Sequence, residues 1–248
     1  MGRPSALFFD LDDTLLDGYA AMQAAWGVVL SEACGPLGCD PERLREAIRR
    51  EATEFWRDEG AVAHWRVRLE EARERVIRQA LLAEGLDPSW APRISRRYGE
   101  EHRARLQPFP DTFDTLERLR SQGFRLGLLT NGPAKLQRDK VERFGLARYF
   151  DVIVIEGEFG AGKPSPLVFG HALRTVGAEP HQAWMVGDNL YADIGGAKAS
   201  GLVATWIHRG RLKLPEAPPA LPDRAIGHLA PELWEALELS ASSCQTGL

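Results

Sequence analysis

Ala6-Leu7-Phe8-Phe9-Asp10-Leu11-Asp12-Asp13-Thr14-Leu15 lies close to the N-terminus, and its apolar first part gives way abruptly to carboxylates. The short, aromatic-rich run predicts a buried strand that ends at Asp10. Open α/β sheets bind their ligands at the carboxyl ends of the strands. Three carboxylates within four residues repel one another, so we expect at least one of them to meet a cation. On this stretch alone, a structural strand followed by an acidic turn is the alternative.

The composition and charge of the chain exclude several classes of function. The chain has 248 residues, enough for one large or two modest domains, and a formal net charge of −4, which does not suggest nucleic-acid binding. Its apolar runs are shorter than the roughly 20 residues of a membrane span, and Asp10 interrupts the one that would suit a signal peptide. Cys34, Cys39 and Cys244 show no metal-binding spacing and fit reduced thiols in the cytoplasm, with a local Cys34–Cys39 disulfide as the less favoured alternative.

The stretch between the first apolar run and Pro108 is helical in character. Apolar residues recur at three-and-four spacing from Gly18 onward and over residues 41–57, 62–84 and 90–105. Short breaks separate these segments, so about four helices in a small bundle are predicted. The segment contains arginine but no lysine, and acidic residues roughly match the arginines, which is typical of a solvated helix surface.

Strands and helices alternate after Pro108. Apolar runs bounded by turn residues predict strands at 124–129, 151–155, 183–186 and 202–207, and a short one at 225–228. Helical spacing predicts helices at 111–122, 134–144, 191–200 and 231–239, and one that begins at Pro166 with Ser165 as its N-cap. Residues 240–248 are expected to fray. Alternation of this kind predicts a parallel sheet covered by helices on both faces.

Polar residues follow several of these predicted strands. They are Asp10 and Asp12, Thr130 and Asn131, Lys163 after a glycine-rich loop, and Asp188 with Asp193 five residues later. The carboxyl ends of parallel strands share one edge of a sheet, so these groups are expected to converge there. Carboxylates can hold Mg²⁺, whereas a hydroxyl, backbone amides and an ammonium can hold phosphate oxygens. One carboxylate could then attack phosphorus.

The four ordered motifs of the haloacid dehalogenase-like hydrolase superfamily resemble Asp10-Leu11-Asp12-Asp13-Thr14, Thr130-Asn131-Gly132, Lys163-Pro164 and Gly187-Asp188 with Asp193. The resemblance covers residues 5–16 and about 108–208, and the helical insert is similar to a type-one cap. It implies a Rossmann-like, doubly wound parallel core of residues 1–16 and 108–248 and an α-helical bundle cap of residues 17–107. Within that superfamily the chain resembles small-metabolite phosphatases of the N-acylneuraminate-9-phosphatase and pyrimidine-nucleotidase kind, which share the Asp-Leu-Asp-Asp-Thr-Leu opening and the Thr-Asn-Gly turn.

The resemblance implies a role for each carboxylate. Asp10 is expected to be the nucleophile and a Mg²⁺ ligand, and Asp188 a second carboxylate ligand. Asp12 is expected to be the general acid for the leaving alcohol and then the base for water, with its backbone carbonyl on the metal. Asp193 is expected to support these ligands, either by binding the metal through a water molecule or by positioning Lys163. Thr14 is likewise expected to support the ligands without binding the metal directly.

The phosphate site is implied in the same way. Thr130 and the amide of Asn131 are expected to bind phosphate, and Lys163 to neutralise charge on the phosphoryl group and on the nucleophile. A hydroxyl that is satisfied locally at a strand end is the alternative for Thr130. A lone lysine in a Gly/Pro-rich loop is usually just solvated, and only the surrounding motifs favour a role for Lys163.

The expected function is a cytoplasmic Mg²⁺-dependent phosphatase that forms an aspartyl-phosphate. Its substrate would be a small phosphate ester, such as a sugar phosphate, a sugar-acid phosphate or a nucleotide, and its state a monomer or homodimer without nucleic-acid or membrane partners. A sugar-phosphate mutase would use the same core, and a non-catalytic binding module is the alternative of another class. Dehalogenation does not fit the pairing of Asp10 with Asp12, and phosphonate hydrolysis does not fit a cap without lysine.

Overall fold

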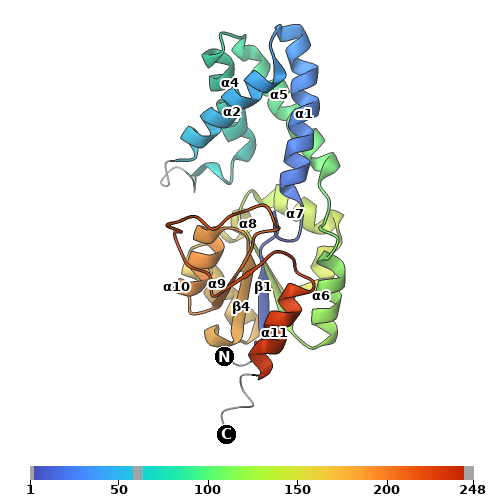
Figure 1. Ribbon diagram of the computed structural model, residues 1–248, viewed down its shortest axis with the longest axis vertical. Coiled ribbons are helices and arrows are strands. Elements are labelled where there is room, and N and C mark those ends of the chain that lie inside the picture. The colour runs from blue at the N-terminus through green and yellow to red at the C-terminus, as the bar shows by residue number, and fades with distance from the viewer. Residues whose placement is uncertain (1–2, 58–61, 63, 243–248) are drawn as a thin grey trace. The chain divides into compact units, whose positions relative to one another are not determined.

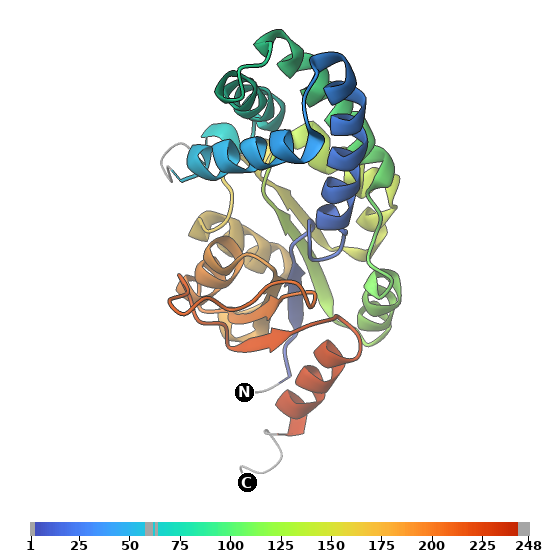
Figure 2. The same ribbon diagram turned by 45° about the horizontal axis from the view of Figure 1, so that its top comes forward.

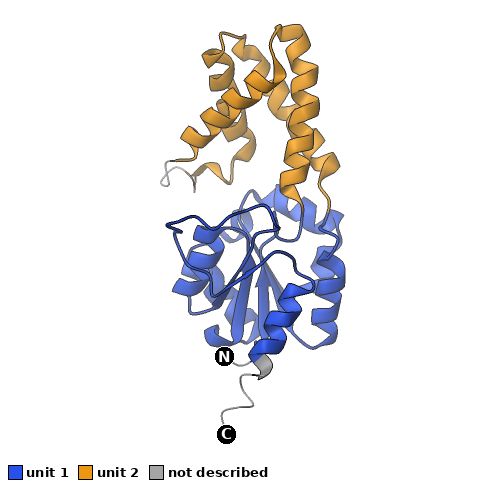
Figure 3. Cartoon of the chain, viewed as in Figure 1, with its two compact units in different colours: residues 1–16, 108–248 blue, residues 17–107 orange. Residues whose placement is uncertain are grey.

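The computed structural model describes residues 3–57, 62 and 64–242. The chain divides into two compact units, residues 1–16 with 108–248 and residues 17–107 (Figure 3). Cys244, one of the three cysteines expected to be reduced, and residues 243–248, expected to fray, lie outside the described residues. Cys34 and Cys39 are both free thiols. No described helix is long and apolar enough to cross a membrane.

The first unit is built on a parallel sheet in the order β3-β2-β1-β4-β5-β6. Figure 1 labels its two central strands, β1 and β4. Its strands are β1 (Ala6–Phe9), β2 (Arg125–Thr130), β3 (Val152–Ile155), β4 (Ala183–Gly187), β5 (Val203–Ile207) and β6 (Arg224–Ile226). The order runs outward in one direction from β1 to β3 and in the other from β4 to β6. This confirms the predicted doubly wound sheet and puts its switch point between β1 and β4, where such sheets bind ligands.

Helices cover both faces of this sheet (Figures 1 and 2). They are α6 (Thr112–Ser121), α7 (Ala134–Arg143), α8 (Glu156–Phe159), α9 (Pro166–Val176), α10 (Gly196–Ala199) and α11 (Glu232–Ser242), with short 3₁₀ turns η2 (Leu146–Tyr149) and η3 (Pro180–Gln182). Phe8 of β1 is fully buried in a core cluster with Phe169 of α9 and Met185 of β4. Successive side chains of a strand point to opposite faces, so Leu7 and Phe9, also fully buried, support the other layer.

The second unit is the helical bundle that the apolar spacing predicts. It contains α1 (Gly18–Leu37), α2 (Pro41–Phe55), α4 (Leu69–Ala83) and α5 (Ala91–Arg105), with a 3₁₀ turn η1 (Pro88–Trp90) before α5. Helix α1 packs against α5 and α2 packs against α4. Their shared core includes Val29, Leu44, Ile77 and Ile94. Polar N-caps start two of the helices: the Asp17 and Asp40 carboxylates accept backbone N–H bonds from Ala20 and Arg43.

Several predicted boundaries are wrong for identifiable reasons. The helix predicted over 62–84 is interrupted: residues 62, 64 and 65 are helical, residues 66–67 form a turn, and α4 begins at Leu69. The helix predicted at 191–200 is a π-helical segment, η4 (Leu190–Gly195), followed by the short α10. The predicted fraying begins too early, because Ser240 is buried in α11 and donates its hydroxyl to the Leu237 carbonyl. The N-cap at Ser165 and the Pro166 start of α9 are confirmed.

The two crossings of the chain out of and back into the first unit lie side by side. Leu16 and Pro108 form an isolated antiparallel bridge, and the Phe109 N–H donates to the Leu15 carbonyl at 3.0 Å. The buried Arg209 fixes this junction, since its guanidinium donates to both Asp111 oxygens at 2.9 Å and to the carbonyl of Thr14. The turn that carries Asp12 is thereby attached to the rigid sheet.

Candidate active site

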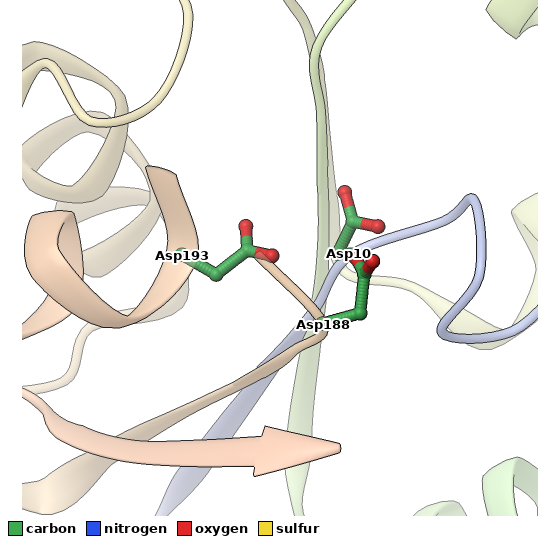
Figure 4. Close-up of side chains that lie close together, drawn as sticks. All are labelled: Asp10, Asp188 and Asp193. Atoms are coloured by element: carbon green, nitrogen blue, oxygen red, sulfur yellow. The ribbon is translucent and has the colours of Figure 1, made fainter. Parts of the chain in front are cut away.

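Carboxylates gather at the switch point of the sheet. Asp10 follows β1 directly and Asp188 follows β4, the two strands between which the order reverses. Asp193 approaches from η4, and Figure 4 shows its side chain directed toward those of Asp10 and Asp188. Each of the three offers a carboxylate oxygen, and these oxygens all lie within 4.8 Å of one another. The fold therefore concentrates negative charge at one point.

A single buried ammonium joins two of these carboxylates. Lys163, which follows the glycine-rich loop after α8, is 1% exposed, and its Nζ lies 2.6 Å from an oxygen of Asp10 and 2.6 Å from an oxygen of Asp193. A buried lysine is tolerated only when its charge is compensated, and here two carboxylates compensate it. Lys163 thus lies where it can balance charge on Asp10 and on anything bound to it.

The electrostatics of the cluster favour an added cation. Burial raises the pKa of Asp10 from 3.8 to about 7, with Asp193 adding to the rise and Lys163 opposing it. Burial also raises the pKa of Asp188 to about 9, and Asp10, Asp193 and Asp13 add to it. For Lys163, burial would lower the pKa, but Asp10 and Asp193 raise it above its usual value. The cluster is short of positive charge even with Lys163 in place.

The π-helical segment η4 explains how Asp193 reaches the cluster. The N–H groups of Asp193 and Ile194 both donate to the Asn189 carbonyl, which gives the wide turn, and the Asn189 side chain accepts from two further N–H groups. The Asp193 carboxylate in turn accepts the Asn189 N–H at 3.0 Å. A side chain at Gly187 would overlap this carboxylate, so the last residue of β4 has to be glycine. π-Helical turns of this kind often mark functional sites.

The Thr-Asn-Gly turn after β2 is tied to the lysine loop. The Asn131 side chain donates to the Lys163 carbonyl and accepts from the Lys163 N–H, both at 2.8 Å. The Gly132 N–H donates to the buried Glu156 carboxylate of α8 at 3.0 Å. Thr130 is 3% exposed, and its hydroxyl accepts a hydrogen bond from the Gln137 side-chain amide at 2.6 Å. The second and third sequence motifs therefore form one connected support.

Asp12 does not join the carboxylate cluster with its side chain. It is held by α7, where Lys140 donates to both its oxygens at 2.8 and 2.7 Å and Gln137 donates to one of them at 2.9 Å. The neighbouring Asp13 adopts a positive φ of 57°, which aspartate tolerates better than most residues, and its N–H donates to the Leu16 carbonyl. This tight turn carries the Asp12 side chain toward α7.

Thr14 is fully buried behind this turn, and its carbonyl accepts from Arg209. The structure thus brings together Asp10, Asp188, Asp193 and Lys163, places Thr130 at the end of β2 and Asn131 directly after it, and pairs the Asp12 carboxylate with α7 rather than with Lys163.

Gln137, Lys140 and Glu156 are absent from the set of residues expected from the sequence. A signal for the first two was present, because residues three apart on a helix share a face and this face follows the Thr-Asn-Gly turn directly. Glu156 gave no comparable signal, since its contact with Gly132 depends on the pairing of β2 with β3.

The chain is similar in sequence and in fold to several known proteins. The sequence model of the haloacid dehalogenase-like hydrolase family matches residues 4–201. The phosphoserine phosphatase of Thermus thermophilus is 36% identical over 246 residues, a match that covers 90% of this chain and 95% of that protein. The N-acylneuraminate-9-phosphatase of Mus musculus is 30% identical over 238 residues and 88% of each chain. Among solved structures, the HAD-hydrolase YfnB of Bacillus subtilis superimposes with a TM-score of 0.76 at 24% identity, covering 95% of this chain and 99% of that one.

Proposed function

The chain belongs to the haloacid dehalogenase-like hydrolase family and is a phosphoric monoester hydrolase, and from this premise we propose that it dephosphorylates a small metabolite through an aspartyl-phosphate on Asp10. The resemblance predicted from the four motifs, including that to N-acylneuraminate-9-phosphatases, is confirmed. We also propose that the enzyme requires Mg²⁺ and is a monomer or homodimer. We propose a cytoplasmic location as well, which is in keeping with the free thiols of Cys34 and Cys39.

The observation that carries the mechanism is the placement of Asp10. Its carboxylate stands at the switch point of the sheet, 2.6 Å from the Lys163 ammonium and beside Asp188. Such a carboxylate is rigidly held, and the ammonium is set to balance the charge of a phosphoryl group that arrives next to it. Thr130 and the Asn131 N–H in the adjoining turn are proposed to hold the phosphate oxygens.

The proposed reaction has two halves. First, an Asp10 oxygen attacks phosphorus, the bond from phosphorus to the ester oxygen breaks, and the Asp12 carboxylic acid gives its proton to the departing alcohol. Then the Asp12 carboxylate takes a proton from a water molecule, whose oxygen attacks phosphorus and releases inorganic phosphate from Asp10. Both carboxylates end as they began, and Lys163 keeps its proton throughout because its pKa is raised.

The residues of the cluster fit a divalent cation. Three carboxylate oxygens within 4.8 Å of one another and the raised pKa values of Asp10 and Asp188 describe a site that lacks positive charge. Asp10, Asp188 and the Asp12 carbonyl are the proposed ligands. Asp193 is the proposed support, because one of its oxygens pairs with Lys163 and the other already accepts the Asn189 N–H. Mg²⁺ prefers such oxygen ligands, and when bound it would stabilise negative charge on the phosphoryl oxygens.

Metal binding is expected to stabilise the protein more as pH rises. Asp10 and Asp188 have pKa values raised from 3.8 to about 7 and about 9, so the stability linked to their protonation is complete below the unfolded value and is lost as pH rises through the folded values. Mg²⁺ competes with these protons. The increase in melting temperature on adding Mg²⁺ should therefore be larger at about pH 8.5 than at about pH 6.

Asp188→Asn is the control for this measurement, since it should remove most of the Mg²⁺-dependent increase at both pH values. An increase that is equal at the two pH values, or larger at the lower one, would argue against metal binding by these carboxylates.

The helical unit is proposed to select the leaving group. The core groups described above recognise phosphate, so selectivity between esters needs contacts from elsewhere. Within the helical unit a cavity of about 500 Å³ is lined by Trp26 and Trp56 and by Arg45, Arg49 and Arg73. Aromatic faces and guanidinium groups together suit a sugar, sugar acid or nucleotide better than a plain alkyl chain.

A panel of phosphomonoesters tests the function. The wild-type protein should release inorganic phosphate from at least one sugar phosphate, sugar-acid phosphate, amino-acid phosphate or nucleotide, with Mg²⁺ and not in excess chelator. Transfer of the phosphoryl group to a second site on a sugar without phosphate release would instead identify a mutase. No turnover with any ester, in the presence of Mg²⁺ and with the protein folded, would favour the binding module.

The same panel tests the helical unit. Arg49→Ala and Trp56→Ala should change the ranking of substrates by catalytic efficiency and leave slow hydrolysis of 4-nitrophenyl phosphate largely intact. Arg57→Ala is the matched control, because Arg57 also forms an exposed ion pair on the same stretch of chain but does not line the cavity. An unchanged ranking in both cavity variants would remove this unit as the specificity element.

A further inference from the structure

Two side chains of α7 converge on Asp12, and the two-step reaction gives neither of them a role. Lys140 donates to each Asp12 oxygen, at 2.8 and 2.7 Å, and Gln137 donates to one of them at 2.9 Å. The Lys140 side chain is 11% exposed and that of Asp12 is 37% exposed. Three hydrogen bonds on one carboxylate fix the orientation of its plane, which a single surface ion pair would not do.

The same Gln137 amide also reaches the phosphate site. It donates to the Thr130 hydroxyl at 2.6 Å, so one buried side chain connects the proposed phosphate-binding group with the proposed proton-transfer group. Gln137 and Lys140 lie one turn apart on a helix that begins three residues after Asn131. Helix α7 therefore sets the position of Asp12 relative to the phosphate.

We propose that Lys140 and Gln137 are positioning residues, which hold the Asp12 carboxyl group where it exchanges protons with the leaving alcohol and with water. This proposal rests on the function proposed above. Proton transfer requires the donor within hydrogen-bond reach of the ester oxygen, and a misplacement of about 1 Å can cost on the order of 100-fold in rate. The carboxylates of Asp10, Asp188 and Asp193 have no part in these contacts, so the effect is separable from the nucleophile.

The leaving group of the ester provides the test. An alkyl alcohol must receive a proton as it departs, whereas 4-nitrophenol departs as a stable anion and needs little help. The ratio kcat/KM covers the steps up to the release of the alcohol. Lys140→Met should lower kcat/KM on the best alkyl ester of the panel by about 10-fold or more and on 4-nitrophenyl phosphate by less than about 3-fold.

Three further variants complete the experiment. Lys140→Arg should recover part of the loss, because a guanidinium can donate to both oxygens of a carboxylate. Lys135→Met, at an exposed lysine of the same helix, should behave as wild type on both esters. In an Asp12→Asn background Lys140→Met should add little, since residues that act through one group are not additive.

An equal loss on both esters, or no loss on either, would overturn the proposal and leave Lys140 as a structural ion pair. If circular dichroism shows that Lys140→Met is not folded, Gln137→Met removes the other hydrogen-bond donor to Asp12. The proposal then requires that Gln137→Met lower kcat/KM more on the alkyl ester than on 4-nitrophenyl phosphate. A wild-type protein that hydrolyses neither ester would contradict the proposed function itself, whereas an active wild type without this difference contradicts only the role of Lys140 and Gln137.

Discussion

Asp10→Asn should abolish turnover of every phosphate ester and leave the protein folded. An amide has almost the shape of a carboxylate but cannot form the bond to phosphorus, so the loss should be on the order of 10⁴-fold or more. The oxygen of the introduced amide can still accept from Lys163, whose Nζ lies 2.6 Å from Asp10, and the buried Asp193 keeps its own contact with that ammonium. Phosphate release under Mg²⁺ and a thermal melt are the measurements.

Asp223→Asn is the matched control for this substitution. Asp223 lies in the same unit and pairs with an exposed lysine, Lys198, at 2.6 Å, but it has no contact with the carboxylate cluster among the described residues. Its variant should remain active. If Asp10→Asn retained more than about 1% of activity, a covalent mechanism on Asp10 would be wrong, since losing one acid–base group costs only about 10²–10⁴-fold.

Most of the fold was predictable because its signals are local. Short apolar runs identify β1, β2 and β4, and each run ends where a polar motif begins. Once these strands are placed in one parallel sheet, the topology alone brings Asp10 and Asp188 to the same edge. The change from strand-like to helical spacing after Leu16, and back again before Pro108, likewise marks the two positions where the chain passes between the units. These two positions pair in the structure.

The rest depended on tertiary contacts. The π-helical path of η4 follows from the Asn189 carbonyl accepting two N–H groups and from the glycine at position 187, and helical spacing describes neither. The orientation of Asp12 is set by side chains about 125 residues away, Gln137 and Lys140. The motifs alone place Asp12 with Asp10, because the two are only two residues apart in sequence, whereas the Asp12 side chain contacts α7 after the turn at Asp13.

Lys163→Ala should cause the second large loss, in activity and in stability. Removing the ammonium leaves Asp10 and Asp193, 8% and 1% exposed, without their shared cation. Breaking a buried ion pair by deleting one partner typically costs about 3–5 kcal/mol of unfolding free energy. The developing charge on the phosphoryl group also loses its neutralising group, for which a fall in kcat of about 10²–10³-fold is expected. The measurements are kcat under Mg²⁺ and denaturant unfolding in chelator.

Lys163→Arg should restore charge without restoring activity fully. The ammonium makes two 2.6 Å contacts in a space that leaves the residue 1% exposed, and a planar guanidinium is both longer and wider. Lys198→Ala, which removes a half-exposed ammonium from one carboxylate, is the control and should keep kcat. Mg²⁺ can substitute for part of the lost charge. In Mg²⁺ we therefore expect the unfolding free energy of Lys163→Ala to lie closer to the wild-type value than its kcat does. Wild-type kcat in a folded Lys163→Ala protein would place the lysine loop outside the active site, whatever its contact with Asp10.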